Sequence, residues 1–332
     1  MSTETARILY YGGGWPTNIG NAFIDLGAMA LLRAAVPSAQ VGFASELTTW
    51  LFTHGARPPR ATLRRWIAPA RDQRESFVDN ALDVASVTAC DLVVFAGMAM
   101  CQEFIDVNGP SVLALARRGV PVVLLGTGGL NFDETERSAF RAFLREVEPV
   151  AFISRDNRSY EAYRDSVPVA HAGIDCGFFV PEAFTPFPLS LPPYAALNFD
   201  RRETFHPETP GLLQVHTHHE CFDRIPPGQM RKPRTLISDL PHDYLTLYAG
   251  ASEVHSDRVH ACVAALAYGR RARFYGKTPR ASLFDAVGAG TIGGALTCVD
   301  PAAFADAKRR QVEVVREVVT AALEPALPRK GA

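Results

Sequence analysis

The stretch YYGGGWPTNIGNAFIDLGAMALL, Tyr10–Leu32, joins a short apolar run to a helical pattern through a glycine-rich loop. Residues 8–11 are continuously apolar, which predicts a buried strand. After the loop, apolar side chains recur at helical spacing and predict a helix over residues 21–35. A strand that ends in glycines and enters a helix is typical of the first unit of an α/β protein.

The same alternation continues along the chain. Four further apolar runs predict buried strands at residues 41–44, 92–96, 120–125 and 150–153, and helical spacing predicts helices at 110–118 and 134–146. Because the apolar runs are continuous, the strands are expected to be covered on both faces, as in a doubly wound parallel sheet. Ligands of such sheets bind at the carboxyl ends of the strands.

A proline-dense segment divides the chain. Regular structure is disfavoured where proline is this frequent, so we predict a domain boundary here, with an N-terminal α/β domain at 1–182 and a smaller one at 183–300. Strands of the second domain are expected at 195–199, 212–216, 235–237, 253–255 and 272–275, and a helix at 301–322 begins the C-terminal segment 301–332. The prolines are Pro181, Pro186, Pro188, Pro192 and Pro193.

Composition limits the functional classes. The 332 residues are 47% apolar and 21% charged, and the net charge of −1 comes without a basic block, so no nucleic-acid partner is expected. The N-terminus lacks a leader, and no apolar run approaches the roughly 20 residues of a membrane span, so we expect a cytoplasmic protein without a transmembrane segment. Scattered cysteines without a CxxC pair predict reduced, mostly buried thiols in place of a disulfide framework or a zinc site. We expect neither a metal site nor a cofactor. The cysteines are Cys90, Cys101, Cys176, Cys221, Cys262 and Cys298.

Polar and glycine residues follow several predicted strands. In the first loop, Asn18 or Asn21 is a candidate helix cap, and the glycines permit close approach of a ligand; the alternative is a plain strand-to-helix turn. Neither a dinucleotide nor a P-loop fingerprint is present. Further glycines, among them Gly97 and Gly128, follow the strands at 92–96 and 120–125.

Two polar clusters allow more than one interpretation. Arg155, within Ser154-Arg155-Asp156, either points into the crevice or pairs structurally with Asp156, which would cap the next helix. Asp175 ends the following strand. Three interpretations of the histidines in QVHTHHECF stay open: a metal site, a substrate contact and a polar loop. No recognised ligand spacing supports the metal site. The histidines are His216, His218 and His219.

The stretch EVHSDRVHACVAALAYG, Glu253–Gly269, places two basic residues at the start of a predicted helix. If Ser256 caps this helix, Arg258 and His260 lie on either side of its buried stripe. A cation is unfavourable at a helix N-terminus, so we infer that an anion binds there. In the alternative, Asp257 neutralises Arg258 and His260 is a surface residue.

The sequence resembles the polysaccharide pyruvyl transferase family. The resemblance rests on the order of six elements across residues 8–275: NIGNAFIDLGAMALL, DLVVFAG, GVPVVLLGTG, ISRDNRS, a strand ending in GID, and SDRVHACVAALAYG. It implies two Rossmann-like domains facing a cleft, as in glycosyltransferase-B enzymes, with the C-terminal helix packing back. It also implies transfer of pyruvate from phosphoenolpyruvate onto two hydroxyls of a saccharide as a ketal, the saccharide being free or linked to a lipid or nucleotide. The oligomeric state stays open, a homo-oligomer included.

The resemblance implies roles for the candidate residues. His260 or His255 would be the acid, and Arg258 would hold the donor's phosphate or carboxylate. The other expected donor contacts are Ser256, Lys277, Arg280 and Arg155, and the expected acceptor contacts are Gly13, Asn18, Gly20, Asn21, Gly97, Gly128 and Asp175.

The chain departs from the family at two positions. Many relatives have aspartate where this chain has Asn21, and glycine where it has Met98, so a carboxylate expected on the acceptor side is missing. Two other functions therefore stay open. One is a nucleotide-sugar glycosyltransferase, with Glu253 or Asp239 holding the ribose, and the other is a non-catalytic binder of sugar phosphates.

Overall fold

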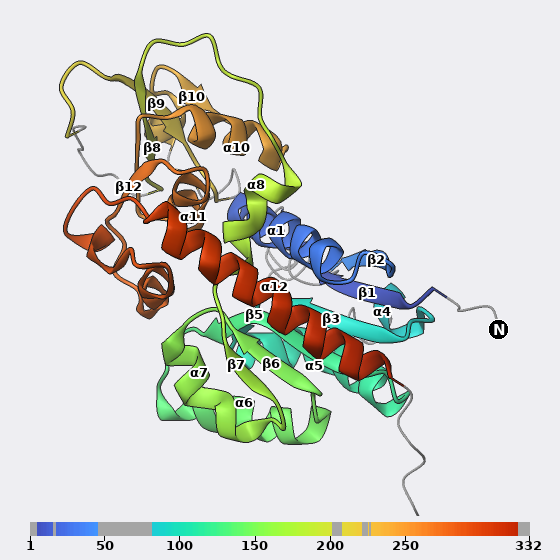
Figure 1. The fold of residues 1–332 in the computed structure, drawn as a ribbon. Coiled ribbons are helices and arrows are strands. Elements are labelled where there is room, and N and C mark those ends of the chain that lie inside the picture. Colours follow the sequence, from blue (N-terminus) through green and yellow to red (C-terminus); the bar gives the residue numbers. More distant parts are fainter. Residues whose placement is uncertain are drawn as a thin grey trace, which may run out of the picture.

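The computed structural model describes residues 5–15, 18–45, 82–200, 208–220, 225 and 227–324. Within them the chain forms two separate parallel sheets, shown one below the other in Figure 1. The predicted parallel α/β architecture is confirmed. Cys221 lies outside the described residues.

The first sheet has the strand order β2-β1-β3-β5-β6-β7, and β4 pairs with β5 beside that path. Its central strands, β3 and β5, are buried along their whole length, as their continuous apolar sequences predict. The strands are β1 (Arg7–Gly12), β2 (Gln40–Ser45), β3 (Leu92–Ala96), β4 (Ala99–Met100), β5 (Val122–Gly129), β6 (Ala151–Ser154) and β7 (Ala170–Ala172).

Two of the three helices predicted in the first half lie within two residues of their predicted bounds, and the third differs at its start. The helix predicted to begin at Pro110 begins eight residues earlier, because Phe104 and Asn108 continue its buried stripe with Val112 and Leu115, and the proline is accommodated inside it. The helices are α1 (Ile19–Ala35), α4 (Val84–Val87), α5 (Gln102–Arg117), α6 (Glu134–Val147) and α7 (Asn157–Tyr163).

The second sheet has the order β10-β9-β8-β11-β12. Its strands are β8 (Tyr194–Asn198), β9 (Leu213–Thr217), β10 (Thr235–Leu236), β11 (Glu253–Ser256) and β12 (Arg271–Phe274), and its helices are α9 (Pro227–Met230), α10 (Pro241–Gly250) and α11 (Val259–Ala267). Short helical turns η4 (Cys176–Phe179) and α8 (Val180–Ala183) connect the two halves, and η6 (Pro279–Val287) and η7 (Gly290–Gly293) follow β12.

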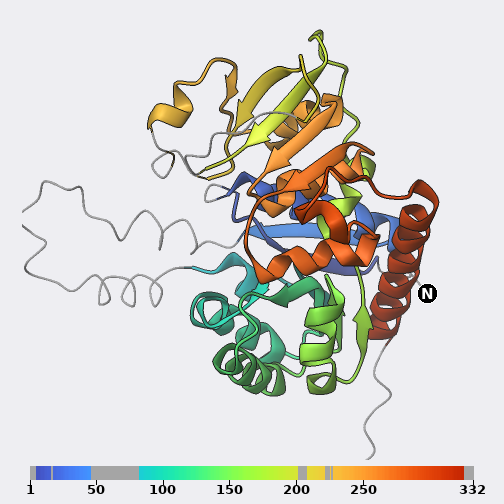
Figure 2. The same ribbon diagram turned by 90° about the vertical axis from the view of Figure 1, so that its left-hand side faces the viewer.

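Helix α12 (Pro301–Leu323) returns from the second half to the first, as predicted. Figure 1 shows it in red beside α1, and Figure 2 shows α1 between the two halves. Arg316 of α12 donates from Nε to the carbonyl oxygen of Ala35, at the end of α1, over 3.1 Å. A single hydrophobic core contains residues of both halves, such as Phe23, Phe178 and Tyr248. The domain boundary at residue 182 therefore stays a prediction, since no break in the core marks it.

None of the helices in the described ranges is long and apolar enough to cross a membrane.

Candidate active site

Two cavities lie at the carboxyl ends of the strands. Cavity A has a volume of about 560 Å³, and cavity B, of about 270 Å³, opens on the glycine-rich loop of the first half. Cavity A is lined by Asn18, Asp200, His219, Glu220, Asp257, Arg258, Val259, His260, Tyr275, Gly276, Lys277, Thr278 and Arg280. Cavity B is lined by Gly13, Gly14, Asn21, Ile24, Asp25, Ala96, Gly97, Met98, Ala99, Cys101, Glu103, Phe104, Val107, Asn108, Arg155 and Arg280.

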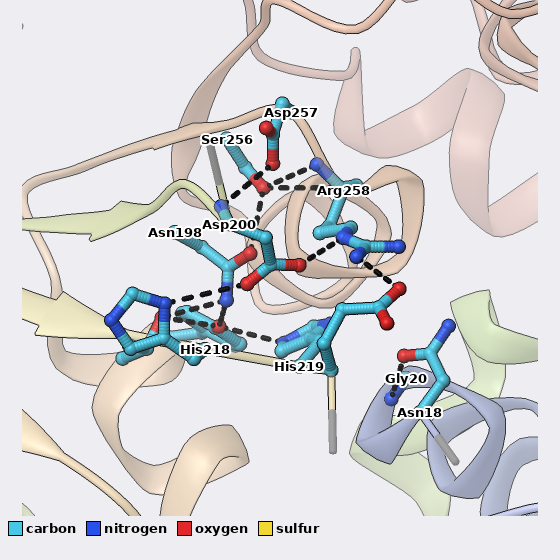
Figure 3. A network of polar contacts seen from close by, with 12 residues as sticks. Asn18, Gly20, Asn198, Asp200, His218, His219, Ser256, Asp257 and Arg258 are labelled. Atoms are coloured by element: carbon cyan, nitrogen blue, oxygen red, sulfur yellow. Dashed lines mark hydrogen bonds and ion pairs between the residues drawn. The ribbon is translucent and has the colours of Figure 1, made fainter. Parts of the chain in front are cut away.

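Arg258 lies in cavity A between two carboxylates. Its Nε donates to Oδ2 of Asp200 and its Nη2 to Oε1 of Glu220. Sequence reasoning named Asp257 as the alternative partner, whereas the structure supplies Asp200 from the end of β8 and Glu220 from the loop after β9. Burial would lower the pKa of Arg258, but the two carboxylates raise it, so its charge is secure. We call this arrangement the Asp200–Arg258–Glu220 clasp, and Figure 3 shows Arg258 within it.

The start of α11 differs by two residues from the prediction. Arg258, not Ser256, is the N-cap, because Ser256 ends β11. The hydroxyl of Ser256 accepts from the backbone N–H of Arg258 at 2.7 Å and so supports the turn. Ser256 therefore supports the turn at the start of α11, but it does not line cavity A.

His260 is an interior residue at the same helix start. Its side chain is 3% exposed, and its Nε2 lies 3.6 Å from Oδ2 of Asp175. Burial lowers the pKa of His260, although Asp175 opposes the shift. Burial would raise the pKa of Asp175, but His260, Arg155 and the N–H of Gly177 outweigh it and lower the pKa. The structure thus pairs a neutral imidazole with an ionised carboxylate, and the expectation that His260 is merely superficial is wrong.

Neither of the two facing atoms has a hydrogen bond within the described parts of the chain. Buried polar atoms without a partner are rare and costly, so this pair is a place where a ligand or water can bind. Asp175 itself is fixed by its other oxygen, which accepts from the N–H of Gly177 at 2.8 Å.

A buried hydrogen-bond network holds His219, which sequence reasoning left among three alternatives. The amide of Asn198 donates to both Oγ1 of Thr217 and the hydroxyl of Tyr248, at 2.8 and 3.1 Å. The two hydroxyls lie 2.9 Å apart, and Nε2 of His219 lies 2.8 Å from the hydroxyl of Tyr248. Figure 3 shows His219 and Asn198 together with Asp200 and Arg258.

The direction of the hydrogen bonds in this network is linked to the tautomer of His219. If Tyr248 donated to Thr217, the hydroxyl proton of Thr217 would have no acceptor among the described residues. If Thr217 donates to Tyr248, both hydroxyl protons are used, and Tyr248 donates to Nε2 of His219. The proton of His219 then sits on Nδ1, which has no hydrogen-bond partner in the described structure. Burial lowers the pKa of His219 to about 3, so the ring is neutral.

The other two histidines do not form a site with it. Nδ1 of His218 lies 3.3 Å from Oδ1 of Asp200 and supports the clasp, and His216 lies on β9 away from both cavities. No group of three or more metal-ligating side chains occurs among the residues described.

Two cations on the segment after β12 complete cavity A. Lys277 is exposed, and Arg280 lines both cavities. Nε of Arg280 is buried and has no hydrogen-bond partner among the described residues, and burial with neighbouring Arg155 lowers its pKa to about 10. The clasp does not engage these two cations of cavity A.

The N-terminus of α1 faces cavity A from the first half. Asn18 is the N-cap, accepting from the N–H of Gly20 at 3.0 Å, and the N–H of Ile19 donates to the carbonyl of His219 at 2.9 Å. A Cβ at Gly20 would lie 3.0 Å from Cβ of His260 and 3.1 Å from Nδ1 of His219. Gly20 is therefore required by the close approach of α1 to both imidazoles.

Cavity B contains three of the predicted acceptor residues, Gly13, Asn21 and Gly97. It also contains Asp25, which sequence reasoning did not name. Asp25 lies one helical turn after Asn21 on the same face of α1.

Arg155 and Gly128 have mainly structural surroundings. The guanidinium of Arg155 is 1% exposed and donates to the carbonyl of Gly129 at 2.7 Å, while Asp156 caps α7 through the N–H of Ser159. Gly128 lies beneath Arg155 and lines neither cavity. The structural alternative is therefore observed, although one edge of Arg155 still borders cavity B.

His255 lies outside the site. It is buried on β11, with Nε2 3.1 Å from Oε1 of Glu253 and Nδ1 3.2 Å from the hydroxyl of Tyr275, and it lines neither cavity. Alternation along the strand explains the placement, because Glu253 and His255 share the face opposite Val254 and Ser256.

Comparison with known proteins agrees with this architecture. Among solved structures, the chain is similar to the co-structure of S. aureus MnaA with UDP (13% identity, 95% of this chain and 91% of that chain covered, TM-score 0.56). It is also similar to UDP-N-acetylglucosamine 2-epimerase from Rickettsia bellii (13%, 97% and 98%, 0.55) and to UDP-GlcNAc 2-epimerase from Methanocaldococcus jannaschii (11%, 95% and 99%, 0.53). These likenesses confirm the glycosyltransferase-B-like fold. No curated protein matches the sequence. The model of one family, polysaccharide pyruvyl transferase, matches residues 18–276, and the chain belongs to this family of enzymes.

Proposed function

We propose that this protein transfers pyruvate from phosphoenolpyruvate onto two hydroxyls of a saccharide as a ketal and releases phosphate. Cavity A takes the donor and cavity B the acceptor, so residues 183–300 form the donor side and residues 1–182 the acceptor side. The observation that carries the proposal is the meeting of His260, Arg280 and Lys277 in one cavity at the start of α11.

The donor's anionic groups are matched by the cations of cavity A. Lys277 and Arg280 approach them from the segment after β12, and the N–H groups at the start of α11 add a positive partial charge. Arg258 joins them when the donor competes with Asp200 and Glu220 for its guanidinium. The clasp thereby keeps Arg258 charged and positioned before the donor arrives.

Ketal formation requires a proton on the methylene carbon of the donor. We assign this step to His260, because imidazole can donate near neutral pH and this one lies in cavity A. The buried ring is neutral without ligand. A bound donor with several negative charges stabilises the imidazolium and raises the pKa of His260. Asp175 orients the ring and supports its charge. His255, which lines neither cavity, has no role in this mechanism.

The acceptor is held at the glycine-rich end of the first sheet. Asn21 offers its amide in cavity B, with its Nδ2 donating to the carbonyl of Gly14 at 3.0 Å, and Gly13 and Gly97 leave room beside the backbone. Arg280 lies at the junction of the two cavities and is suited to contact both substrates.

The described structure does not favour the nucleotide-sugar alternative. Glu253, one of its two candidate ribose ligands, is fully buried and bound to His255 and Thr209, and Asp239 lines neither cavity. The likeness to UDP-sugar epimerases concerns the fold alone.

The test is phosphate release from phosphoenolpyruvate in the presence of methyl glycosides of glucose, galactose and mannose and of the corresponding UDP-sugars. A product heavier than its acceptor by pyruvate minus one water supports the proposal. Absence of phosphate release with every acceptor, together with a melting temperature that phosphoenolpyruvate does not raise, would overturn it. Stabilisation by phosphoenolpyruvate without turnover on any acceptor would instead indicate the non-catalytic binder.

A further inference from the structure

Asp25 occupies a position in cavity B that the sequence alone does not explain. Its side chain is 4% exposed, yet it borders the cavity beside Asn21 and Gly13. A buried acid needs compensation, and three donors supply it here. Oδ1 accepts from the hydroxyl of Tyr10 at 2.6 Å, and Oδ2 accepts from the N–H of Gly13 at 3.0 Å and from Nε1 of Trp15.

This carboxylate supplies a group that the chain lacks at Asn21. Asn21 lies on the same face of α1, one turn before Asp25, and also borders cavity B. Residues four apart on a helix are neighbours, so Asp25 serves the same cavity from 5–6 Å along the axis, a distance of about one helical pitch. The carboxylate of Asp25 therefore lies one turn farther from the start of α1 than Asn21, beside Tyr10 of β1.

We propose that Asp25 is the general base that accepts the proton of the attacking hydroxyl in cavity B. The inference rests on the proposed function. In the step, the O–H bond of the saccharide breaks and its proton moves to the carboxylate, while the oxygen forms a bond to the central carbon of the protonated donor. In the second attack the other hydroxyl bonds to the same carbon and phosphate leaves. The two hydroxyls release two protons. One of them restores the proton that was given to the methylene carbon, and the other leaves with phosphate.

The surroundings of Asp25 suit this role. Within the described chain, three donors reach the carboxylate, whose two oxygens offer about four lone-pair positions, so one position is left for a hydroxyl. Burial raises the pKa of Asp25, although Tyr10, Trp15 and Gly13 oppose the shift. A carboxylate with a raised pKa is a stronger base than an exposed one.

The test compares Asp25→Asn with the wild type in the phosphate-release assay, using phosphoenolpyruvate and the acceptor of the panel that turns over fastest. We expect kcat to fall by about 10²–10⁴ while the KM for phosphoenolpyruvate changes less than about threefold. The matched control is Asp165→Asn, whose side chain is 93% exposed and remote from both cavities, and it should keep full activity. A kcat of Asp25→Asn within about threefold of wild type overturns the inference and leaves the proposed function intact.

A second variant covers the case in which Asp25→Asn does not fold. Tyr10→Phe removes the donor on Oδ1 but keeps the carboxylate, so the pKa of Asp25 rises further. Because the base acts when ionised, the acidic limb of the kcat profile should move to higher pH, with full activity recovered above it. The other titratable or charged groups that border the cavity are Glu103 of α5, Cys101 at the N-cap of α5, Arg155 and Arg280, and Tyr10→Phe leaves all four in place. An acidic limb that does not move overturns the inference.

Failure of the two proposals can be told apart. If the wild type consumes no phosphoenolpyruvate with any acceptor, the function and the inference fail together. If the wild type is active and the Asp25 variants match it in rate and pH profile, only the inference fails.

Discussion

Nε2 of His260 lies 3.6 Å from Oδ2 of Asp175, and both side chains are almost fully buried where the two halves of the chain meet. The carboxylate is the acidic neighbour that favours a proton on this imidazole, while burial opposes it. The balance between these two effects determines the pH range in which His260 can donate a proton.

Replacing His260 by alanine should lower kcat by about 10²–10⁴, as expected for a lost general acid. Asp175→Asn should instead lower the pKa of His260, so the alkaline limb of the kcat profile moves to lower pH. The rate near pH 8 then falls by about tenfold for every full pH step that the limb moves. Rates measured from pH 5 to pH 9 check both variants. If His260→Ala turns over near the wild-type rate with saturating phosphoenolpyruvate, the assignment of the acid is wrong.

The clasp predicts opposite effects of two substitutions on donor affinity. Glu220→Gln weakens one of the two attachments of Arg258, so phosphoenolpyruvate should bind more tightly, by about two- to tenfold. Arg258→Gln removes the cation, so donor affinity should collapse. It also leaves the mostly buried Asp200 with one fewer partner, which costs about 1–3 kcal/mol in the free energy of unfolding. Titration calorimetry and urea denaturation measure these quantities, and weaker donor binding by Glu220→Gln would contradict the competition between donor and clasp.

Two histidines with lowered pKa values predict a loss of stability in acid. Burial lowers the pKa of His219 to about 3 and that of His216 to about 4, against 6.5 for an ordinary histidine. Below pH 6.5 the unfolded chain therefore binds protons that the folded chain does not, so stability falls as the pH drops. Each histidine contributes a slope of up to about 1.4 kcal/mol per pH unit until its own folded pKa is reached.

The slope can be assigned by substitution. His219→Gln should flatten the dependence of the free energy of unfolding between pH 6 and pH 4 by about one such contribution, measured by urea denaturation at each pH. His216→Gln should also flatten the pH dependence of the free energy of unfolding, but only above about pH 4, because His216 binds its proton in the folded protein below that pH. An unchanged slope in both variants would show that these rings are protonated in the folded protein.

The tautomer of His219 is open to direct measurement. Nitrogen chemical shifts should show the proton on Nδ1 in the wild type. Tyr248→Phe removes the donor to Nε2 and the acceptor of the Thr217 proton, so the preference for this tautomer should disappear and stability should fall by about 1–3 kcal/mol. A proton found on Nε2 in the wild type would reverse the direction of hydrogen bonding deduced for this network.

The fold was predictable because it depends on local patterns. Continuous apolar runs located β1, β3 and β8 to within about two residues, since strands covered on both faces leave no polar position within them. The start of α5 was not predictable in this way. Proline is a common first residue of a helix, so Pro110 indicated a helix start, and only the burial of Phe104 and Asn108 shows that Pro110 lies inside α5.

The site was predictable only in part, because pairing across the chain leaves no local signal. Arg258 and His260 were marked by their unusual place at a helix start, but their partners come from distant segments: Asp200 from the end of β8, Glu220 from beyond β9 and Asp175 from the first half. Asp25 was hidden inside an amphipathic helix. Its spacing of four residues from Asn21 is the signal that could have revealed it.

Helix α12 gives the chain a second crossing between its halves. The first crossing is the segment from η4 through α8, and the second is α12, whose Arg316 is bound to the end of α1. Helix α1 also packs against α10 and α11, so the two halves are joined by packing as well as by these two connections. Helix α12 thus packs against α1, whose N-cap Asn18 borders cavity A, and so supports one wall of a cavity to which it contributes no side chain.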